Sequence, residues 1–212
     1  MTWILTKESD IMEWNRLADK PIVEKTMAAL RNQGMEPYFC ENAEEANSKI
    51  RSLIPNGAEI MNMSSTTLDM LGISKEIQES GNSVKKKLGS MDRKTQGNEM
   101  QKLGAAPEWA IGSVHAVTEK GEVMIVSQSG SQLPAYAYGS NHVIWVVGTQ
   151  KIVKNLDDGF KRIYEHCLPL ESERARKVYG VPSSSVNKIL IVNKETKPGR
   201  IMVIFVNQVL GF

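Results

Sequence analysis

Apolar residues recur along the chain with two alternating periods. Helical spacing places them on one face in three segments, at residues 21–33, 42–53 and 155–167. Short apolar runs that favour strands lie around these segments, at residues 37–40, 58–63, 113–118, 122–127, 142–147, 188–192 and 201–206. Alternation of the two periods about every ten to fifteen residues predicts an α/β fold, a Rossmann-like layered sheet covered by helices.

Local signals at the ends of these segments support their boundaries. Gly34 follows the first helical segment, where a left-handed residue can end a helix. Asn42 with Glu45 three positions later is typical of a capping pair. Residues 119–121, Glu-Lys-Gly, predict a hairpin between two strand runs. Residues 197–199, Lys-Pro-Gly, predict a turn that joins the last two runs as an antiparallel C-terminal strand pair.

The stretch from about 73 to 104 differs in composition from the rest of the chain. It is rich in Lys, Gln, Asn, Ser and Met, carries three consecutive lysines at 85–87, and predicts a helix at about 91–103. We interpret it as a helical surface excursion, beneath which Trp109 and Ile111 pack. Residues 1–20 are interpreted as a helical lead-in. Since no linker or repeat divides the sequence, we expect one domain over 1–212.

Composition excludes several classes of protein. The chain has 212 residues, 41% of them hydrophobic, which suits one soluble globular domain. Its formal net charge of +2 is too small to favour nucleic acid or an anionic membrane as a partner. Cys40 and Cys167 stand far apart, so neither a disulfide framework nor a chain-borne metal or iron-sulphur site is expected. Without a long apolar segment, the chain is expected to be cytoplasmic.

Two polar loops follow predicted strands and are candidate ligand sites. The first loop contains Ser64, Ser65, Thr66 and Thr67, whose hydroxyls and free backbone N–H groups could hold an anion where a helix begins. A simple helix cap is the alternative. The second loop offers a glycine for close backbone approach together with side chains that donate and accept hydrogen bonds: Ser127, Ser129, Gly130, Ser131 and Gln132. Its alternative is a tight structural turn.

Catalytic candidates are few. His115 lies on a predicted strand near Glu119 in sequence, and a histidine beside a carboxylate could move protons near neutral pH. Most histidines in such positions are hydrogen-bonded parts of the scaffold, and the three in this chain have no metal-ligand spacing. Tyr136 and Tyr138 follow the second loop, and either phenol could line a pocket, although core packing is the commoner use.

Several stretches resemble one known family. The run GSVHAVTEKGEVMIVSQSGSQLPAYAYGSNHVIWVVGTQKIVKNLDDGFKRI, then LPLESERARKVYG, the closing PGRIMVIFVNQVLGF and the earlier MNMSSTTLDMLGI are similar to the LUD (lactate utilisation) domain family of the LutC/YkgG type. The resemblance runs from about residue 20 to the end. It implies a fold related to the ribose-phosphate isomerase, glucosamine-phosphate deaminase and CoA-transferase group, in which related enzymes bind phosphate or carboxylate at the first loop.

The resemblance also implies functions. One is the binding of a small carboxylate- or phosphate-bearing metabolite, as a non-cluster subunit in the oxidation of lactate or another 2-hydroxy acid. Iron-sulphur clusters would then be on partner subunits, and this chain alone would bind no cofactor. A second is a stand-alone isomerase, transferase or cyclo-ligase acting on a sugar phosphate, acyl-CoA or folate, with Glu119 as base or nucleophile. A third is a non-catalytic assembly subunit. The apolar end VNQVLGF could help to form a homodimer.

Overall fold

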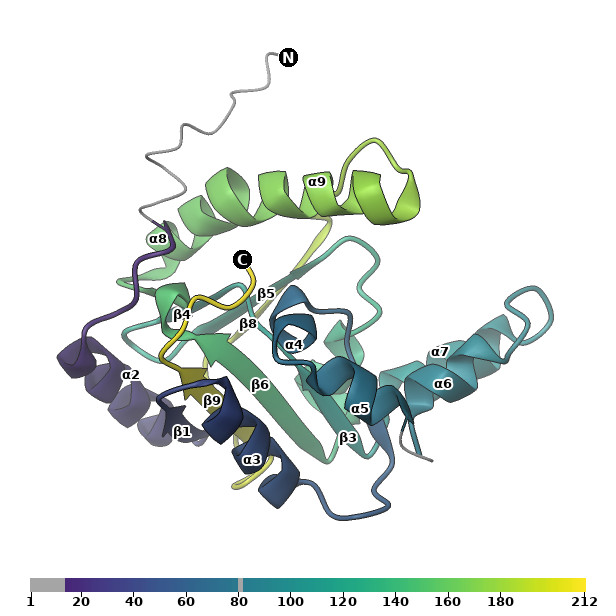
Figure 1. Cartoon of the computed structure of the whole chain (residues 1–212), viewed down its shortest axis with the longest axis horizontal. Helices are drawn as coiled ribbons and strands as arrows, with labels where there is room; N and C mark the ends of the chain where they lie inside the picture. The colour runs from purple at the N-terminus through teal and green to yellow at the C-terminus, as the bar shows by residue number, and fades with distance from the viewer. Residues whose placement is uncertain (1–13, 80–81) are drawn as a thin grey trace.

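Two β-sheets that pack face to face form the body of the molecule (Figure 1). The structure is a computed structural model, and it describes residues 14–79 and 82–212. Residues 1–13, most of the predicted helical lead-in, lie outside the described part. The mixture of parallel strands and covering helices confirms the predicted α/β class.

The main sheet is parallel throughout. Its strands lie in the spatial order β1 (Glu36–Cys40), β9 (Ile201–Val206), β6 (His142–Gly148), β3 (Trp109–Gly112) and β2 (Ile60–Asn62). The two longest, β6 and β9, are apolar and buried along nearly their whole length, as expected for strands covered on both faces. The apolar runs of the sequence predict each of these strands except β3, whose residues Trp109 and Ile111 were expected only to pack beneath the excursion.

A second, mixed sheet covers part of the main one. Its strands lie in the order β7 (Ile152–Val153), β4 (Ala116–Thr118), β5 (Val123–Ser127) and β8 (Lys188–Val192). Strands β4 and β5 form the predicted antiparallel hairpin. Buried side chains of both sheets, Val123 and Ile125 from one and Val203 and Phe205 from the other, belong to one apolar cluster. The second sheet is therefore held by the same core as the first.

The predicted antiparallel pairing of the last two strands is wrong. Strand β8 pairs antiparallel with β5 in the second sheet, whereas β9 runs parallel between β1 and β6 in the main sheet. Burial explains the separation. Every residue of β9 is buried, which suits a central strand, but β8 is partly exposed along its length and suits an edge. The turn at 197–199 carries the chain from one sheet to the other.

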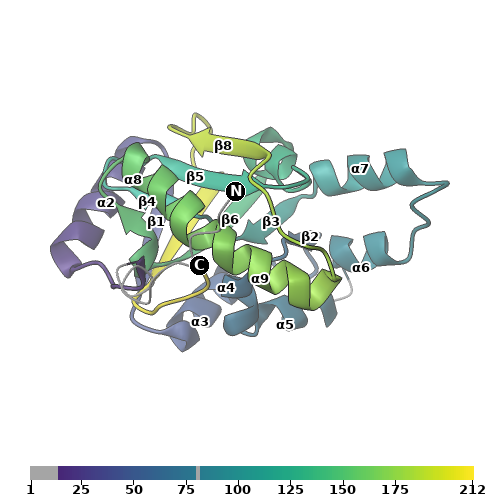
Figure 2. The same cartoon turned by 90° about the horizontal axis from the view of Figure 1, so that it is seen from above.

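Helices fill the outer layers (Figure 2). One face of the main sheet is covered by α3 (Ala43–Leu53), α4 (Thr66–Met70) and α5 (Ile73–Glu79). The other face meets α2 (Lys20–Asn32) and the second sheet. Against the far side of the second sheet pack α8 (Leu156–Lys161) and the π-helical turn η3 (Arg162–Cys167), which continues into α9 (Leu168–Tyr179). None of the described helices combines the length and the apolar character that crossing a bilayer requires.

Helix termini follow the predicted local signals. Asn42 Oδ1 accepts a hydrogen bond from the Glu45 N–H at 3.0 Å, which confirms the cap of α3. Gly34 adopts φ +78° just after α2, as expected at a helix end. In the lysine-rich stretch, α5 is followed by α6 (Val84–Gly89) and α7 (Gly97–Ala105), and the last two extend away from the sheets (Figure 1). The helix expected at about 91–103 thus begins later, at Gly97.

The chain crosses between the two sheets at two places that lie close together. Residues 113–115 connect β3 to β4, and a short 3-10 turn, η2 (Thr149–Lys151), connects β6 to β7. Because β3 and β6 are neighbours and run parallel, both connections begin on the same side of the main sheet, where its strands have their carboxyl ends. Loops at the carboxyl ends of parallel strands are where α/β proteins commonly bind ligands.

Candidate functional site

A cavity of about 380 Å³ lies at the carboxyl ends of the strands of the main sheet. The connections after β2, β3 and β6 contribute to its lining, as does the loop after β5 in the second sheet. Helix α9 borders the cavity through Leu168, Glu171 and Arg174. In Figure 1 this helix passes beyond the carboxyl end of β6. The cavity is therefore bounded by both sheets and one helix.

The two polar loops meet in this cavity. The lining residues among those predicted from the sequence are Ser64, Ser65, Thr66, Thr67, His115, Ser127, Ser129, Ser131 and Gln132. Two predicted residues are not part of the lining. Gly130 sits at the tip of the second loop with φ +85°, and Glu119 forms an ion pair with Lys25 at 2.6 Å, outside this cavity. The structure does not bring Glu119 and His115 together in one site.

The first loop begins a short helix. Ser65 Oγ accepts a hydrogen bond from the Leu68 N–H at 3.4 Å and caps α4, which has only five residues. Lys85 Nζ donates to Ser64 Oγ at 3.4 Å, so a lysine from α6 reaches this loop. Thr67 is buried and its Oγ1 donates to the Leu210 carbonyl at 3.1 Å. The loop thus combines a structural cap with hydroxyls that line the cavity.

The second loop is largely stabilised by its own hydrogen bonds. Ser127 Oγ accepts from the Gly130 N–H at 2.8 Å and donates to Gln132 Oε1 at 2.9 Å. Ser129 Oγ donates to Ser131 Oγ at 3.1 Å. These bonds fix the turn, so the loop forms a defined wall of the cavity without a ligand.

Lys151 provides a buried positive charge at the cavity. It ends η2, is 1% exposed, and its Nζ donates to Thr67 Oγ1 and Ser113 Oγ, each at 3.0 Å, and to the Val114 carbonyl at 3.2 Å. Within the described part of the chain, no carboxylate forms an ion pair with it. Burial, and then the nearby Arg162 charge, lower the pKa of Lys151 to about 7.

A second buried cation lies beside the first. Arg162, from η3, is fully buried, and its Nη1 donates to the His115 carbonyl at 2.6 Å and to Cys167 Sγ at 2.9 Å. Its Nε and Nη2 have no hydrogen-bond partner among residues 14–79 and 82–212. Lys151 and Arg162 therefore bind the carbonyls of consecutive residues, 114 and 115. Neither cation forms an ion pair with a carboxylate of the described residues.

His115 is held in its neutral form. Its Nδ1 accepts a hydrogen bond from the Val126 N–H at 3.2 Å. Burial lowers the pKa of His115 to about 3, and the charges of Lys151 and Arg162 act in the same direction. At neutral pH the ring is therefore uncharged, and its titration lies well below the range in which we expected it to move protons.

Asn62 and Tyr136 add polar atoms that have no protein partner. Both residues are buried and line the cavity, and neither the Asn62 amide atoms nor Tyr136 Oη forms a hydrogen bond within the described residues. Gly112 makes room for the phenol, since a Cβ at this position would lie 1.7 Å from Tyr136 Oη. Buried polar groups are normally hydrogen-bonded, so these enclosed, unpartnered atoms are an unusual feature of the cavity wall.

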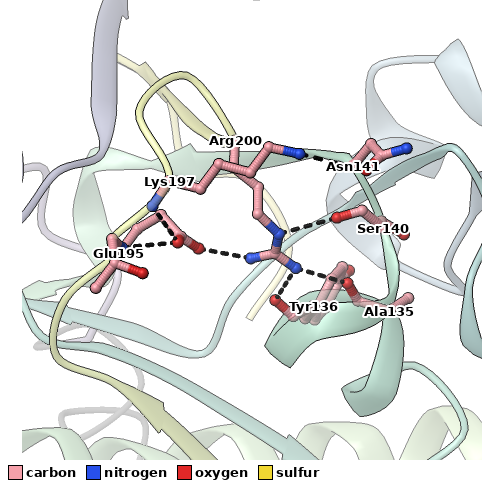
Figure 3. Close-up of polar contacts among 8 residues, drawn as sticks. Ala135, Tyr136, Ser140, Asn141, Glu195, Lys197 and Arg200 are labelled. Atoms are coloured by element: carbon pink, nitrogen blue, oxygen red, sulfur yellow. Dashed lines mark hydrogen bonds and ion pairs between the residues drawn. The ribbon is translucent and has the colours of Figure 1, made fainter.

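Arg200 fixes the segment that carries Tyr136 (Figure 3). Tyr136 belongs to a π-helical turn, η1 (Ala135–Gly139). The Arg200 guanidinium donates to the carbonyls of Ala135 at 3.1 Å, Tyr136 at 2.9 Å and Ser140 at 2.9 Å. Its Nη1 pairs with Glu195 at 2.7 Å. This largely buried pair ties the start of β9 to the cavity wall.

Lys151, Arg162 and Asn62 are not among the site residues predicted from the sequence. Lys151 is the one charged residue in the run 142–153, which could have marked it as unusual. Arg162 lies three residues after buried Gly159 and four before buried His166, a spacing that indicates the inner face of a helix.

Of the two tyrosines, Tyr136 lines the cavity and Tyr138 is exposed. The described residues contain no group of three or more His, Cys, Asp or Glu side chains that could hold a metal ion.

Comparison with known proteins identifies a family and a solved structure of similar fold. A family model described as LUD domain matches residues 23–206. The structure is similar to the crystal structure of a DUF162 family protein from Deinococcus radiodurans, with a TM-score of 0.55 and 12% sequence identity, over 91% of this chain and 100% of that chain. At this identity the likeness shows the fold alone. No curated protein matches the sequence.

Proposed function

The chain belongs to the LUD domain family, and from this premise we propose that its cavity binds a small metabolite that carries a carboxylate or a phosphate. The ligand would lie between the loop at 64–67 and the loop at 127–132. Both loops line a cavity of about 380 Å³, a volume in the range that small-molecule sites commonly have.

The observation that carries the proposal is the uncompensated charge of Lys151. A buried charge without a partner is costly, because it has lost its hydration and gained no ion pair. Here the three hydrogen-bond acceptors of Nζ are neutral oxygen atoms. Arg162 adds a second positive charge nearby and also lacks a described carboxylate partner. An anion in the cavity would supply the missing countercharge.

We further propose a role in the use of lactate or a related 2-hydroxy acid. In this role the chain is a cytoplasmic subunit that holds the small acid, and partner subunits carry the iron-sulphur clusters. The resemblance to the LutC/YkgG type supports the proposal. A hydroxyl-lined, cationic cavity is compatible with it, since a 2-hydroxy acid offers one carboxylate and one hydroxyl for recognition.

Lys151→Met tests the cationic cavity. Binding of lactate, glycolate and inorganic phosphate is measured by calorimetry and by thermal shift, because a ligand that prefers the native state raises its melting temperature. We expect at least one of them to bind, and the substitution to weaken its binding by roughly tenfold or more, since removing one partner of a buried charge pair costs about 2 kcal/mol or more.

The matched control is Lys120→Met. It removes the same charge from the exposed hairpin turn, outside the cavity lining. We expect it to leave the affinity unchanged. Equal weakening by both variants would mean that only overall charge matters, and equal affinity of Lys151→Met and the native protein would rule out this cavity as the anion site.

A further inference from the structure

The surroundings of Lys151 suit an uncharged amine as well as an ammonium ion. Two of its three hydrogen-bond partners are the hydroxyls of Thr67 and Ser113, and the third is the Val114 carbonyl. A hydroxyl can donate as well as accept. Thr67 Oγ1 already donates to the Leu210 carbonyl. If Nζ loses a proton, the Ser113 hydroxyl, whose bond to the Val114 carbonyl is long at 3.4 Å, can turn and donate to the nitrogen lone pair. A carboxylate could not do so, and none binds Nζ within the described residues.

The neighbouring charge favours the uncharged form. Arg162 stays protonated, because a guanidinium does not lose its proton in proteins, and it binds the carbonyl next to the one that Lys151 binds. A lysine that is buried beside another cation is a known arrangement for a nucleophilic amine. The pKa of Lys151, lowered to about 7 by burial and by this charge, is consistent with it.

The cavity also offers polar groups that a carbonyl compound requires. Asn62 and Tyr136 line the same cavity as Lys151, are buried, and have polar atoms with no partner in the described part of the chain. An amide N–H or a phenol can donate to a carbonyl oxygen and so polarise it. A lysine amine and side chains with unpartnered polar atoms therefore border the same cavity.

We propose that the Lys151 amine forms an imine with the carbonyl carbon of a 2-oxo acid bound in the cavity. This inference rests on the proposed function and names the substrate class, since a 2-oxo acid is what oxidation of a 2-hydroxy acid yields. The nitrogen lone pair attacks the carbonyl carbon, and the carbonyl electron pair moves to oxygen. That oxygen then leaves as water with the two amine hydrogens, so that amine and ketone give imine and water.

The carboxylate of such a substrate fits the site for an electrostatic reason. It is attached directly to the reacting carbon, so imine formation keeps the negative charge next to the lysine nitrogen and near Arg162. A protonated imine restores the positive charge of Lys151, and the carboxylate then compensates it. An aldehyde whose phosphate lies several bonds away would place its charge farther from Nζ.

Reductive trapping tests the imine. The native protein is incubated with pyruvate and sodium cyanoborohydride, which reduces an imine to a stable secondary amine, and is then analysed by intact mass and peptide mapping. We expect one adduct on Lys151 with a mass gain equal to pyruvic acid less one oxygen atom. Labelling of Lys151 should exceed that of other lysines by about tenfold or more, because its lowered pKa leaves far more free amine at neutral pH.

Variants and a second ligand separate binding from imine formation. Lys151→Arg keeps the charge but cannot form an imine, so it should bind lactate and lose the adduct. Lys120→Arg, at an exposed lysine outside the cavity lining, should keep the adduct. If lactate and pyruvate both stabilise the native protein but peptide mapping finds no preference for Lys151, the imine is overturned and the proposed function stands. If neither acid stabilises the protein, the proposed role in the use of a 2-hydroxy acid fails.

Glyceraldehyde 3-phosphate distinguishes the substrate class. It carries a carbonyl and a negative charge, but the charge belongs to a distant phosphate. We expect weaker trapping at Lys151 with this compound than with pyruvate at equal concentration. Preferential trapping of the phosphorylated aldehyde would overturn the assignment to 2-oxo acids.

Discussion

A group of four basic side chains, two that line the cavity and two that are buried next to them, is the main feature at the scale of single residues. Lys151 and Arg162 are buried cations, and His115 and His166 lie near them as neutral rings. Burial lowers the pKa of His166 to about 4, and the charges of Arg162 and Lys151 add to the effect. Both ring nitrogens of His166 lack a partner within the described residues. The two buried cations therefore disfavour protonation of His115 and His166.

This arrangement predicts acid sensitivity. Both histidines have folded-state pKa values below the unfolded value of 6.5, so between pH 6.5 and about 4 the unfolded chain binds more protons than the native protein. Stability should consequently be highest above pH 6.5 and decrease as pH falls, by up to about 1.4 kcal/mol for each unit of lowered pKa.

Urea unfolding between pH 4.5 and 7.5 measures the effect. His166→Leu removes one titrating ring whose nitrogens have no described partner, so its stability should depend less steeply on pH. We also expect little loss of stability at pH 7 from this substitution, because a buried, unpaired polar ring is replaced by an apolar side chain. A slope identical to that of the native protein would contradict the assignment.

Two π-helical turns position the cavity residues at the scale of secondary structure. Turn η1 contains Tyr136, and η3 contains Arg162 and Cys167. A π-helical turn has one more residue per hydrogen-bonded loop than an α-helix, which rotates the following side chains, and such turns are frequent at functional sites. The fit of η1 against β3 depends on Gly112, because the phenol of Tyr136 occupies the place of a side chain there.

Gly112→Ala should therefore displace Tyr136. The added Cβ would lie 1.7 Å from Oη and 3.1 Å from Cζ of this tyrosine, so we expect a loss of about 1–3 kcal/mol, as for other overpacked cores. The free energy of unfolding is measured by urea titration. Tyr136→Phe removes the colliding oxygen, and the double variant should recover much of the loss.

A double-mutant cycle gives the coupling between the two positions. Gly89→Ala is the control, since a Cβ there would meet nothing within 4 Å at the end of α6. It should not destabilise the protein. Additive effects of Gly112→Ala and Tyr136→Phe would mean that the phenol does not occupy this space.

At the scale of the whole molecule, the last strand in the sequence lies inside the main sheet. Strand β9 lies between β1, near the start of the described chain, and β6. Arg200, just before β9, binds three carbonyls of 135–140 and pairs with Glu195. One side chain thus joins the C-terminal strand to the cavity wall.

Arg200→Met should be strongly destabilising. It removes the cation from the largely buried Glu195 carboxylate, which keeps only the backbone N–H groups of Thr196 and Lys197, and it leaves three carbonyls without their donor. Breaking a buried ion pair costs about 3–5 kcal/mol. Urea unfolding measures the loss. Arg51→Met, which breaks the exposed pair with Glu76, is the control and should have a far smaller effect. Similar losses for the two variants would show that Arg200 contributes no more than a surface pair.

Much of the local structure could be predicted because it depends on neighbours in sequence. The cap at Asn42, the left-handed Gly34 and the hairpin of β4 and β5 need only a few adjacent residues. The hydroxyl loops at 64–67 and 127–132 were predicted as candidate sites for the same reason, and the structure places them in one cavity. Whether they bind a ligand stays a prediction.

The sequence by itself determined the α/β class, most of the strands and helices, and the residues of the two polar loops, because apolar periodicity and turn chemistry act over short distances. Only the tertiary structure decided that β8 and β9 belong to different sheets, that Glu119 lies apart from His115, and that Lys151 is buried beside Arg162. The physical reason is that burial and electrostatic fields depend on residues far apart in sequence. On the surface this lysine would be hydrated, but at the cavity it is buried, and no carboxylate of the described residues pairs with it.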